Sequence, residues 1–197
     1  MSDTILRERI VDAALLLAEH RGWEAVRLHD VATELGITLE QIRGEFREKE
    51  EIVDAWFDRA DRAMLEAGAA PGLASLTPRE RIVLLLMTWL AALHVHRRPT
   101  RQMIVNKLEF GHVHYQFIGL LRVSRTVQWL REAAHRDAVL PWRALEETAL
   151  TAIYLTTFAY WMQDDSTDSA RTRELLNGLL RRAERFARLV PGFRHAA

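Results

Sequence analysis

The stretch that decides the fold of this 197-residue chain is LHDVATELGITLEQIRGEF, residues 28–46. Its apolar residues recur at helical spacing on both sides of Gly36, which predicts two short helices joined by a tight turn. Thr38 and, three residues later, Gln41 form a capping-box pattern that marks the start of the second helix. The arrangement is a helix-turn-helix layout.

Helical spacing continues on both sides of this stretch. The residues from Ile10 to Ala18 predict a long amphipathic helix that stops at Gly22, and those from Ile52 to Met64 predict a fourth helix. Segment 68–77 contains Gly, Pro and Ser and is the best candidate linker. The helix-turn-helix therefore stands at the start of a chain that continues as helices.

The rest of the chain shows no strand-like alternation, so we expect an all-α fold. The sequence TPRE at residues 77–80 supplies a capping Thr, a Pro at the first helical position and a Glu at the third. The stretches 82–95 and 149–162 are apolar on nearly all sides, and such helices must be covered all round. The chain's own core, a second subunit or a bound apolar ligand could supply that cover. Further helices are expected at about 100–109, then after a break at Gly111 through Leu121 and Trp129 to His135, and at about 141–163 and 168–189.

The segment Arg9–Phe57 resembles the N-terminal domain of TetR-family transcription regulators. The matching residues are Ile10, Ala13, Ala14, Gly22, Asp30, Val31, Ala32, Leu35, Gly36, Ile37, Thr38, Ile42, Phe46, Lys49 and Glu50. The resemblance implies a homodimer with a helix-turn-helix domain at residues 1–50 and a helical ligand-binding and dimerisation domain at 51–197, joined by a helix at about 49–67. It also implies a DNA-binding transcription regulator that senses an apolar small molecule.

In such a dimer the two recognition helices must lie about 34–36 Å apart to enter successive major grooves, and the ligand changes that spacing. The residues expected to contact duplex DNA are Arg27, Thr38, Gln41, Arg43, Arg47 and Lys49. The sequence departs from the family's usual recognition helix at Glu40, Gln41, Arg43 and Glu45, and Arg27 stands where the second helix usually opens with Thr or Ser.

The charge of this segment opposes DNA binding. Residues 1–55 contain seven basic and thirteen acidic side chains, a net charge of −6, and the rest of the chain carries +6. Because DNA affinity depends on neutralising phosphates, an acidic domain weakens the sequence-independent part of binding. A Glu can still accept a hydrogen bond from a cytosine amino group, so Glu residues on the recognition helix do not exclude base reading.

A second resemblance covers residues from Ala149 to about Phe186. The runs Ala152–Thr157 and Tyr160–Ser166 resemble the ubiquinone-biosynthesis accessory proteins that share the TetR fold. This resemblance implies an alternative function, that of a lipid-binding accessory protein of quinone or isoprenoid metabolism. In that case the acidic helix-turn-helix no longer binds DNA.

Two sets of residues in the C-terminal half follow from these expectations. Those expected to line a pocket for an apolar ligand are Trp89, Met103, Phe117, Leu121, Trp129, Tyr154, Thr157, Phe158 and Trp161. Those expected at the homodimer interface are Ile153, Leu176, Leu179, Leu180, Ala183 and Ala187. We expect Leu179→Glu or Trp161→Glu to give a monomer or an aggregate.

Other classes of site lack support in the sequence. There is no cysteine, and the two His-Val-His triplets, at 94–96 and 112–114, point their histidines apart on a helix, so no metal site is expected. No phosphate-binding glycine motif or nucleophile motif is present, so we expect neither a cofactor nor an enzyme. The chain starts without a signal-peptide pattern, and its longest uncharged run, 148–163, is short for a membrane span. A cytoplasmic protein is the expectation.

Overall fold

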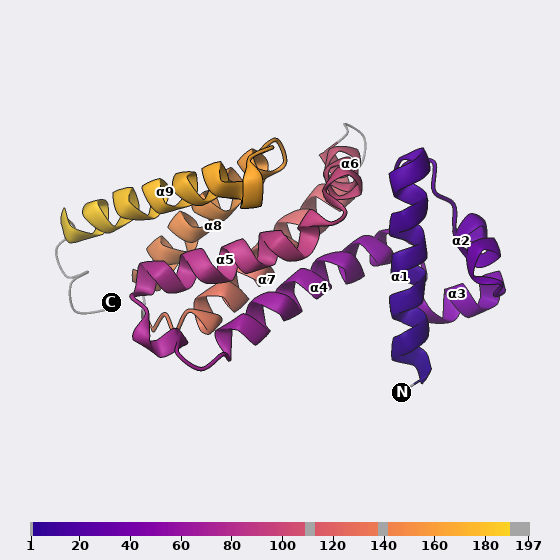
Figure 1. Cartoon of the computed structure of the whole chain (residues 1–197), viewed down its shortest axis with the longest axis horizontal. Coiled ribbons are helices and arrows are strands. Elements are labelled where there is room, and N and C mark those ends of the chain that lie inside the picture. Colours follow the sequence, from indigo (N-terminus) through magenta and orange to yellow (C-terminus); the bar gives the residue numbers. More distant parts are fainter. Residues whose placement is uncertain (1, 109–112, 138–141, 190–197) are drawn as a thin grey trace. The chain divides into compact units, whose positions relative to one another are not determined.

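The computed structural model describes residues 2–108, 113–137 and 142–189. Every regular element in these ranges is a helix and none is a strand (Figure 1). The predicted all-α class is therefore confirmed. None of the described helices is long and apolar enough to cross a membrane.

The chain divides into two compact units, and both are discontinuous in sequence. Unit 1 comprises residues 1–59 and 93–116, and unit 2 comprises residues 60–92 and 117–197. Helix α4, Lys49–Gly68, contributes its first half to unit 1 and its second half to unit 2. The sequence did not predict that residues 93–116 would pack with the N-terminal helices.

Unit 1 is built around the helix-turn-helix. Besides the start of α4 it contains α1 (Ser2–Arg21), α2 (Leu28–Leu35), α3 (Leu39–Glu45) and α6 (Arg97–Leu108). Helices α2 and α3 pack along one side of α1 (Figure 1). These bounds agree with the short helices predicted on either side of Gly36.

The backbone conformation of Gly36 and the hydrogen bonds beside it account for the turn between α2 and α3. Gly36 has a φ of +65°, a left-handed conformation that suits glycine because it has no Cβ, and Ile37 N–H donates to Ala32 O at 3.0 Å to close α2. Thr38 Oγ1 accepts a hydrogen bond from Gln41 N–H at 3.2 Å, and Gln41 Oε1 accepts one from Thr38 N–H at 2.9 Å. The predicted capping box is therefore confirmed.

Apolar residues of four helices form the core of unit 1. Among the most deeply buried, each at most 1% exposed, are Ile10, Ala14, Val31, Ile42, Phe46 and Ile52. Helix α6 joins this unit through polar contacts as well, because the Trp56 indole N–H donates to Thr100 Oγ1 at 2.9 Å. Burial of each large apolar side chain contributes roughly 1.5–3 kcal/mol, so this small unit has a well-defined core.

Unit 2 is a bundle of longer helices. Besides the end of α4 it contains most of α5 (Pro78–His94), most of α7 (Val113–Ala133), α8 (Trp142–Trp161) and α9 (Ala170–Leu189), with short 3₁₀ turns at Leu73–Ser75 and Thr167–Ser169. The predicted capping at the start of α5 is present, since Thr77 N–H and Oγ1–H donate to Glu80 Oε2 at 2.8 and 2.7 Å. Helices α8 and α9 lie side by side (Figure 1).

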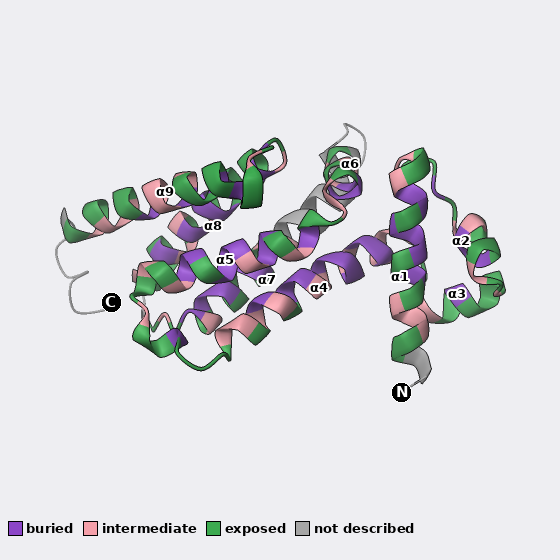
Figure 2. Cartoon of the chain, in the orientation of Figure 1, coloured by how far each residue is buried: buried purple, intermediate pink, exposed green. Residues whose placement is uncertain are grey.

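The two helices that are apolar all round, α5 and α8, are buried to different extents within the chain. On α5 the chain's own core covers nearly every apolar side chain, and buried and exposed residues alternate along the helix (Figure 2). Among the described residues of α5, Leu84 is the large apolar one that stays exposed. Helix α8 buries one face and leaves Leu155 and Tyr160 each 42% exposed. The chain's own core is therefore enough to bury the apolar side chains of α5. Helix α8 keeps an exposed apolar surface that a second subunit or a ligand would have to cover.

Candidate functional sites

The exposed surface of α2 and α3 holds most of the residues predicted to contact DNA. Arg27, Thr38, Gln41, Arg43 and Arg47 are all exposed. Arg27 is the N-cap residue of α2 but makes no side-chain cap, because a guanidinium has no hydrogen-bond acceptor, and it donates to the carbonyl of Glu24. The structure therefore brings these residues together on α2, α3 and the residues that directly flank them within unit 1.

Three of the predicted contacts are already engaged within unit 1. The Gln41 carboxamide oxygen serves the capping box, and the Arg27 guanidinium holds a carbonyl of the 21–27 turn. Lys49 is half-buried, where its ammonium donates to Trp23 O at 2.6 Å and lies 4.6 Å from the centre of the Trp23 ring. Burial, and secondarily the positive charge of Arg27, lowers the pKa of Lys49. Lys49 thus has a structural role that its sequence position did not reveal.

Arg43 and Glu40 form an ion pair on the solvent side of α3. Arg43 Nε lies 3.1 Å from Glu40 Oε2, and the two side chains are 74% and 77% exposed. The next residue, Gly44, is helical, and a Cβ built on it would meet nothing within 4 Å. Arg47 makes no side-chain ion pair with the described residues, although its backbone N–H donates to Glu51 Oε2 at 2.7 Å.

Several acidic residues of unit 1 are neutralised locally. Arg59 on α4 pairs with Glu8 and Asp12 of α1, both at 2.6 Å. Glu19 lies 3.1 Å from His96, the residue that precedes α6. Residues 93–116 also bring a net charge of +3 into unit 1, so the folded unit carries −3 rather than the −6 counted over the N-terminal segment. Folding therefore weakens the electrostatic objection to DNA binding.

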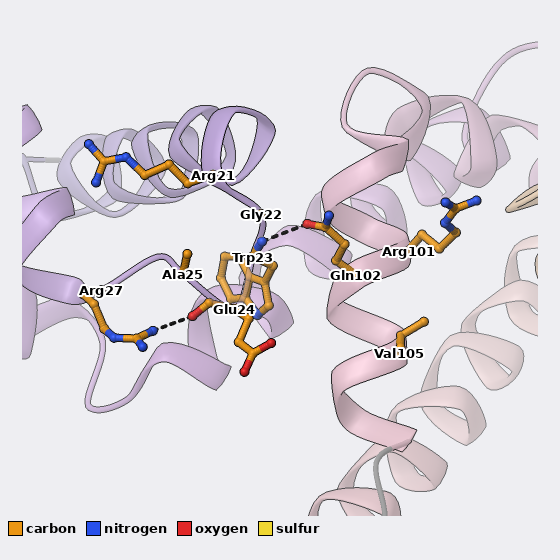
Figure 3. A pocket seen from close by; sticks show the side chains of 9 residues that line it. All are labelled: Arg21, Gly22, Trp23, Glu24, Ala25, Arg27, Arg101, Gln102 and Val105. Carbon is orange, nitrogen blue, oxygen red and sulfur yellow. Dashed lines mark hydrogen bonds between the residues drawn. The ribbon is translucent and has the colours of Figure 1, made fainter.

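A groove of about 680 Å³ opens in unit 1 between the 21–27 turn and α6 (Figure 3). Gln102 Oε1 accepts a hydrogen bond from Trp23 N–H at 2.8 Å. Three arginines line the groove, but Figure 3 shows Arg21 and Arg101 pointing in opposite directions. Because their guanidinium groups do not converge, the groove does not form an assembled anion site.

Unit 2 contains an aromatic cluster where a ligand pocket was predicted. The Trp89 ring packs edge-on against Tyr154 and Phe158, with centroid distances of 5.3 and 5.5 Å, and Phe158 stacks on Trp161 at 5.8 Å. All four side chains are less than 9% exposed. Four of the predicted pocket residues are therefore brought together, on α5 and α8.

The other predicted pocket residues lie elsewhere. Thr157 is fully buried on α8, and its hydroxyl has no hydrogen-bond partner among the described residues. Met103 is buried but belongs to unit 1, and Trp129 is 47% exposed. The side chains of Phe117 and Leu121 lie outside the described part of the chain.

A buried carboxylate next to this cluster was missed by sequence reasoning. Asp61 accepts a hydrogen bond from the Trp89 indole at 2.7 Å and one from Thr126 Oγ1 at 3.1 Å, and its other oxygen lies 3.1 Å from Arg122 Nη2. Burial, together with the negative charge of Asp61, raises the pKa of the Tyr154 hydroxyl far above its usual value, so it stays protonated. Asp61 and Arg122 lie far apart in the sequence, so no local pattern could pair them.

A second buried carboxylate ties α8 to α9. Asp164 accepts hydrogen bonds from the backbone N–H and the hydroxyl of both Ser166 and Thr172, at distances from 2.6 to 3.0 Å. Burial alone would raise the pKa of Asp164, but these four hydrogen bonds outweigh it and lower the pKa well below the usual range. Asp164 belongs to the run Tyr160–Ser166 on which the second resemblance rests, but the sequence did not predict this bonding role.

The residues predicted at the dimer interface divide into two groups. Leu176, Leu180 and Ile153 are already buried within one chain. Leu179, Ala183 and Ala187 are half-buried on α9, and large exposed apolar side chains are found at Leu155 and Tyr160 on α8 and at Phe186 on α9. Trp161 is fully buried, so Trp161→Glu would disrupt the protomer core and could not report on an interface.

Comparison with known proteins connects these features to solved structures. The TetR transcriptional regulator from Nitrosomonas europaea ATCC 19718 is 51% identical to this chain, with a TM-score of 0.82, and the match covers 91% of this chain and 98% of that one. A TetR transcriptional regulator from Rhodococcus sp. RHA1 is 19% identical, with a TM-score of 0.64 over 88% and 95% of the two chains. The regulator PfmR from Thermus thermophilus, also 19% identical, has a TM-score of 0.55 over 88% and 97%. The latter two share the fold.

A family model adds a second similarity. The COQ9 model matches residues 147–187, which cover most of α8 and α9 and the Asp164 turn between them. This segment coincides with the second resemblance noted in the sequence. No curated protein sequence matches this chain.

Proposed function

Because this chain belongs to the TetR family of transcriptional regulators, we propose that it binds operator DNA through α2 and α3 and releases or engages it in response to an apolar small molecule. The observation that carries the proposal is the capped α3 helix, whose outer face presents Glu40, Arg43 and Gly44 to solvent, with Arg47 exposed just beyond the end of the helix. A polar, exposed helix face on a small rigid unit is suited to enter a major groove.

The proposed regulator acts as a homodimer. From Thr148 to Tyr160 the exposed face of α8 is uncharged and carries Ala152, Leu155, Ala159 and Tyr160 at helical spacing, which supports packing against a second copy. Pairing across a two-fold axis gives two recognition helices, whose spacing must match one turn of duplex, ~34–36 Å. A ligand regulates such a dimer only if it binds one spacing more tightly than the other.

The proposed ligand site lies at the aromatic cluster of unit 2. Trp89, Tyr154 and Phe158 supply apolar surface, and the buried Thr157 hydroxyl and the Asp61–Arg122 pair supply polar groups nearby. Ligand pockets combine an apolar lining with a few placed polar groups, which is the composition found here. The ligand is therefore expected to be mainly apolar with a hydrogen-bonding group.

Retention on immobilised random-sequence duplex tests the proposal. The full chain should bind at low ionic strength and elute early in a salt gradient, because few cations are available on an acidic unit. A heparin column in place of the duplex column is the control that measures retention due to charge alone. A chain that passes through the duplex column at the lowest salt used would contradict DNA binding.

A second candidate function is supported by the COQ9 match over residues 147–187. In this alternative the chain is a lipid-binding accessory protein of quinone or isoprenoid metabolism, and its acidic helix-turn-helix no longer contacts DNA. Native mass spectrometry of the purified chain separates the two. A co-purifying isoprenoid together with no duplex retention would favour the accessory role, and duplex retention would favour the regulator.

A further inference from the structure

One face of α3 carries an exposed strip. Its members are Glu40, Arg43 and Gly44, which have the i, i+3, i+4 spacing of a single helix face. Ile42 and Phe46, which belong to the opposite face, are each 1% exposed and anchor the helix in the unit 1 core. The strip therefore faces away from unit 1.

The structure reduces the set of side chains that are available to read bases from this part of unit 1. A Gln reads adenine through its carboxamide oxygen and nitrogen together, but Gln41 Oε1 is committed to the Thr38 N–H at 2.9 Å. Lys49 is half-buried against Trp23, and Arg27 holds the Glu24 carbonyl. Glu40 and Arg43 remain as the polar side chains of α3 that combine high exposure with base-reading chemistry.

The Glu40–Arg43 pair presents donors beside an acceptor. Arg43 uses Nε to hold Glu40 Oε2 at 3.1 Å, and its terminal nitrogens make no hydrogen bond to described residues. The major-groove edge of a guanine–cytosine pair presents two acceptors, guanine N7 and O6, beside the cytosine amino donor. The two patterns are complementary, whereas adenine would place its amino donor against an Arg43 donor.

Gly44 gives this face room for close approach. A glycine inside a helix is less favourable than alanine, and here no part of the chain needs the space, since a Cβ on Gly44 would meet nothing within 4 Å. Its φ lies outside the left-handed range, so backbone conformation does not demand glycine either. A missing side chain beside Arg43 instead lets the helix backbone lie close to an external surface.

We propose that Arg43 and Glu40 together read one guanine–cytosine pair in each half of the operator, with Gly44 admitting the helix to the groove. Arg43 donates to guanine N7 and O6, and Glu40 accepts from the cytosine amino group. This inference rests on the proposed DNA-binding function and adds the base that is read.

Selection from a randomised duplex library with the full chain, followed by sequencing, tests the assignment. Wild-type selections should contain a guanine–cytosine pair at a fixed position of each half-site. Arg43→Lys keeps the charge but loses the two-pronged contact, so preference at that position should fall by roughly 5- to 150-fold, equivalent to about 1–3 kcal/mol. Glu40→Gln should weaken the same position, and Thr38→Ala, a capping variant, should lower affinity equally for all sequences.

Two failures can be told apart. If the wild-type chain recovers no duplex at low salt, the proposed function fails and the inference with it. If it recovers sites whose base preferences are unchanged in Arg43→Lys, or loses preference at an adenine–thymine pair, the inference alone is overturned.

Gly44→Leu supplies an independent readout. The substitution should leave thermal stability equal or higher, because leucine favours helix and the space is open. Duplex affinity should nevertheless fall by at least tenfold, whereas Gly44→Ala should have a smaller effect. Unchanged affinity in Gly44→Leu would show that α3 does not approach DNA through this strip.

Discussion

At the scale of single residues, the buried carboxylates carry interactions that local sequence patterns do not reveal. Asp164 and Asp61 are 4% and 7% exposed; the donors to Asp61 come from distant positions, and those to Asp164 come from the turn that follows it and the start of α9. Removing a hydrogen-bonded buried charge leaves its donors unpaired, so such residues are expected to be among the most sensitive in the chain.

Asp164→Asn should destabilise the chain by about 2–3 kcal/mol, because an amide cannot accept the four hydrogen bonds made by the carboxylate. Urea unfolding at neutral pH measures the change. Asp137→Asn, the same substitution at an exposed position, is the matched control and should change the free energy of unfolding little. Equal stability of the two variants would contradict the bonding role.

The wild type and Asp164→Asn also give a test of the pH dependence of stability. The folded-state pKa of Asp164 lies below its usual value of about 3.9, so its contribution is complete above that pH and is lost as the pH falls below it. The stability difference between wild type and Asp164→Asn should therefore stay constant from neutral pH to about pH 5 and shrink below about pH 4. A difference that grows on acidification would show that the pKa is not depressed.

Asp61→Leu should destabilise the chain by about 3–5 kcal/mol, because it removes the carboxylate that lies 3.1 Å from the buried Arg122 guanidinium. Asp61→Leu combined with Arg122→Met removes both charges and should recover much of the loss. Thermal unfolding of the wild type, both single variants and the double variant gives a double-mutant cycle that measures the coupling between the two side chains. Additive losses would mean that the two side chains are not coupled.

At the scale of elements, the sequence predicted most of the fold because helix signals are local. The capping boxes at Thr38 and Thr77 and the turn at Gly36 depend on residues within four positions of each other, and all three are present. The membership of α6 in unit 1 and the clamp made by Lys49 could not be predicted, because both depend on contacts between distant segments.

The candidate sites were also predictable only where they depend on local patterns and not on contacts between distant segments. Exposure of Arg43 follows from the amphipathic pattern of a short helix, whereas the engagement of Gln41 in its own cap competes with its predicted DNA contact. In unit 2, aromatic spacing on α8 identified Tyr154 and Phe158, but the exposure of Trp129 depends on packing.

The two capping boxes offer a matched pair of substitutions. Thr38→Ala and Thr77→Ala should each cost about 1 kcal/mol of stability, since each removes a hydroxyl from the start of a helix. Thr38→Ala alone should also weaken duplex binding, because it loosens α3. Calorimetry and fluorescence anisotropy measure the two effects. Equal loss of duplex affinity in both variants would argue against a role for α3.

At the scale of the whole molecule, the uncharged face of α8 is the surface proposed for dimerisation. Tyr160→Glu places a charge on that face at a position 42% exposed in one chain, so the protomer should stay folded while the dimer dissociates. Sedimentation and circular dichroism measure the two properties. Val95→Glu, at another exposed apolar residue, is the control and should leave the dimer intact. A dimeric Tyr160→Glu protein would place the interface elsewhere.

The most direct test of the central claim is the salt dependence of duplex binding by wild type, Arg47→Gln and Arg171→Gln, measured by fluorescence anisotropy. If α3 enters DNA in a dimer, Arg47→Gln should reduce the slope of log affinity against log salt by about 2, one phosphate contact per protomer. Arg171→Gln, which removes an exposed arginine from α9, should leave the slope unchanged. Equal slopes for all three proteins, or no salt-dependent binding by the wild type, would contradict DNA recognition through α3.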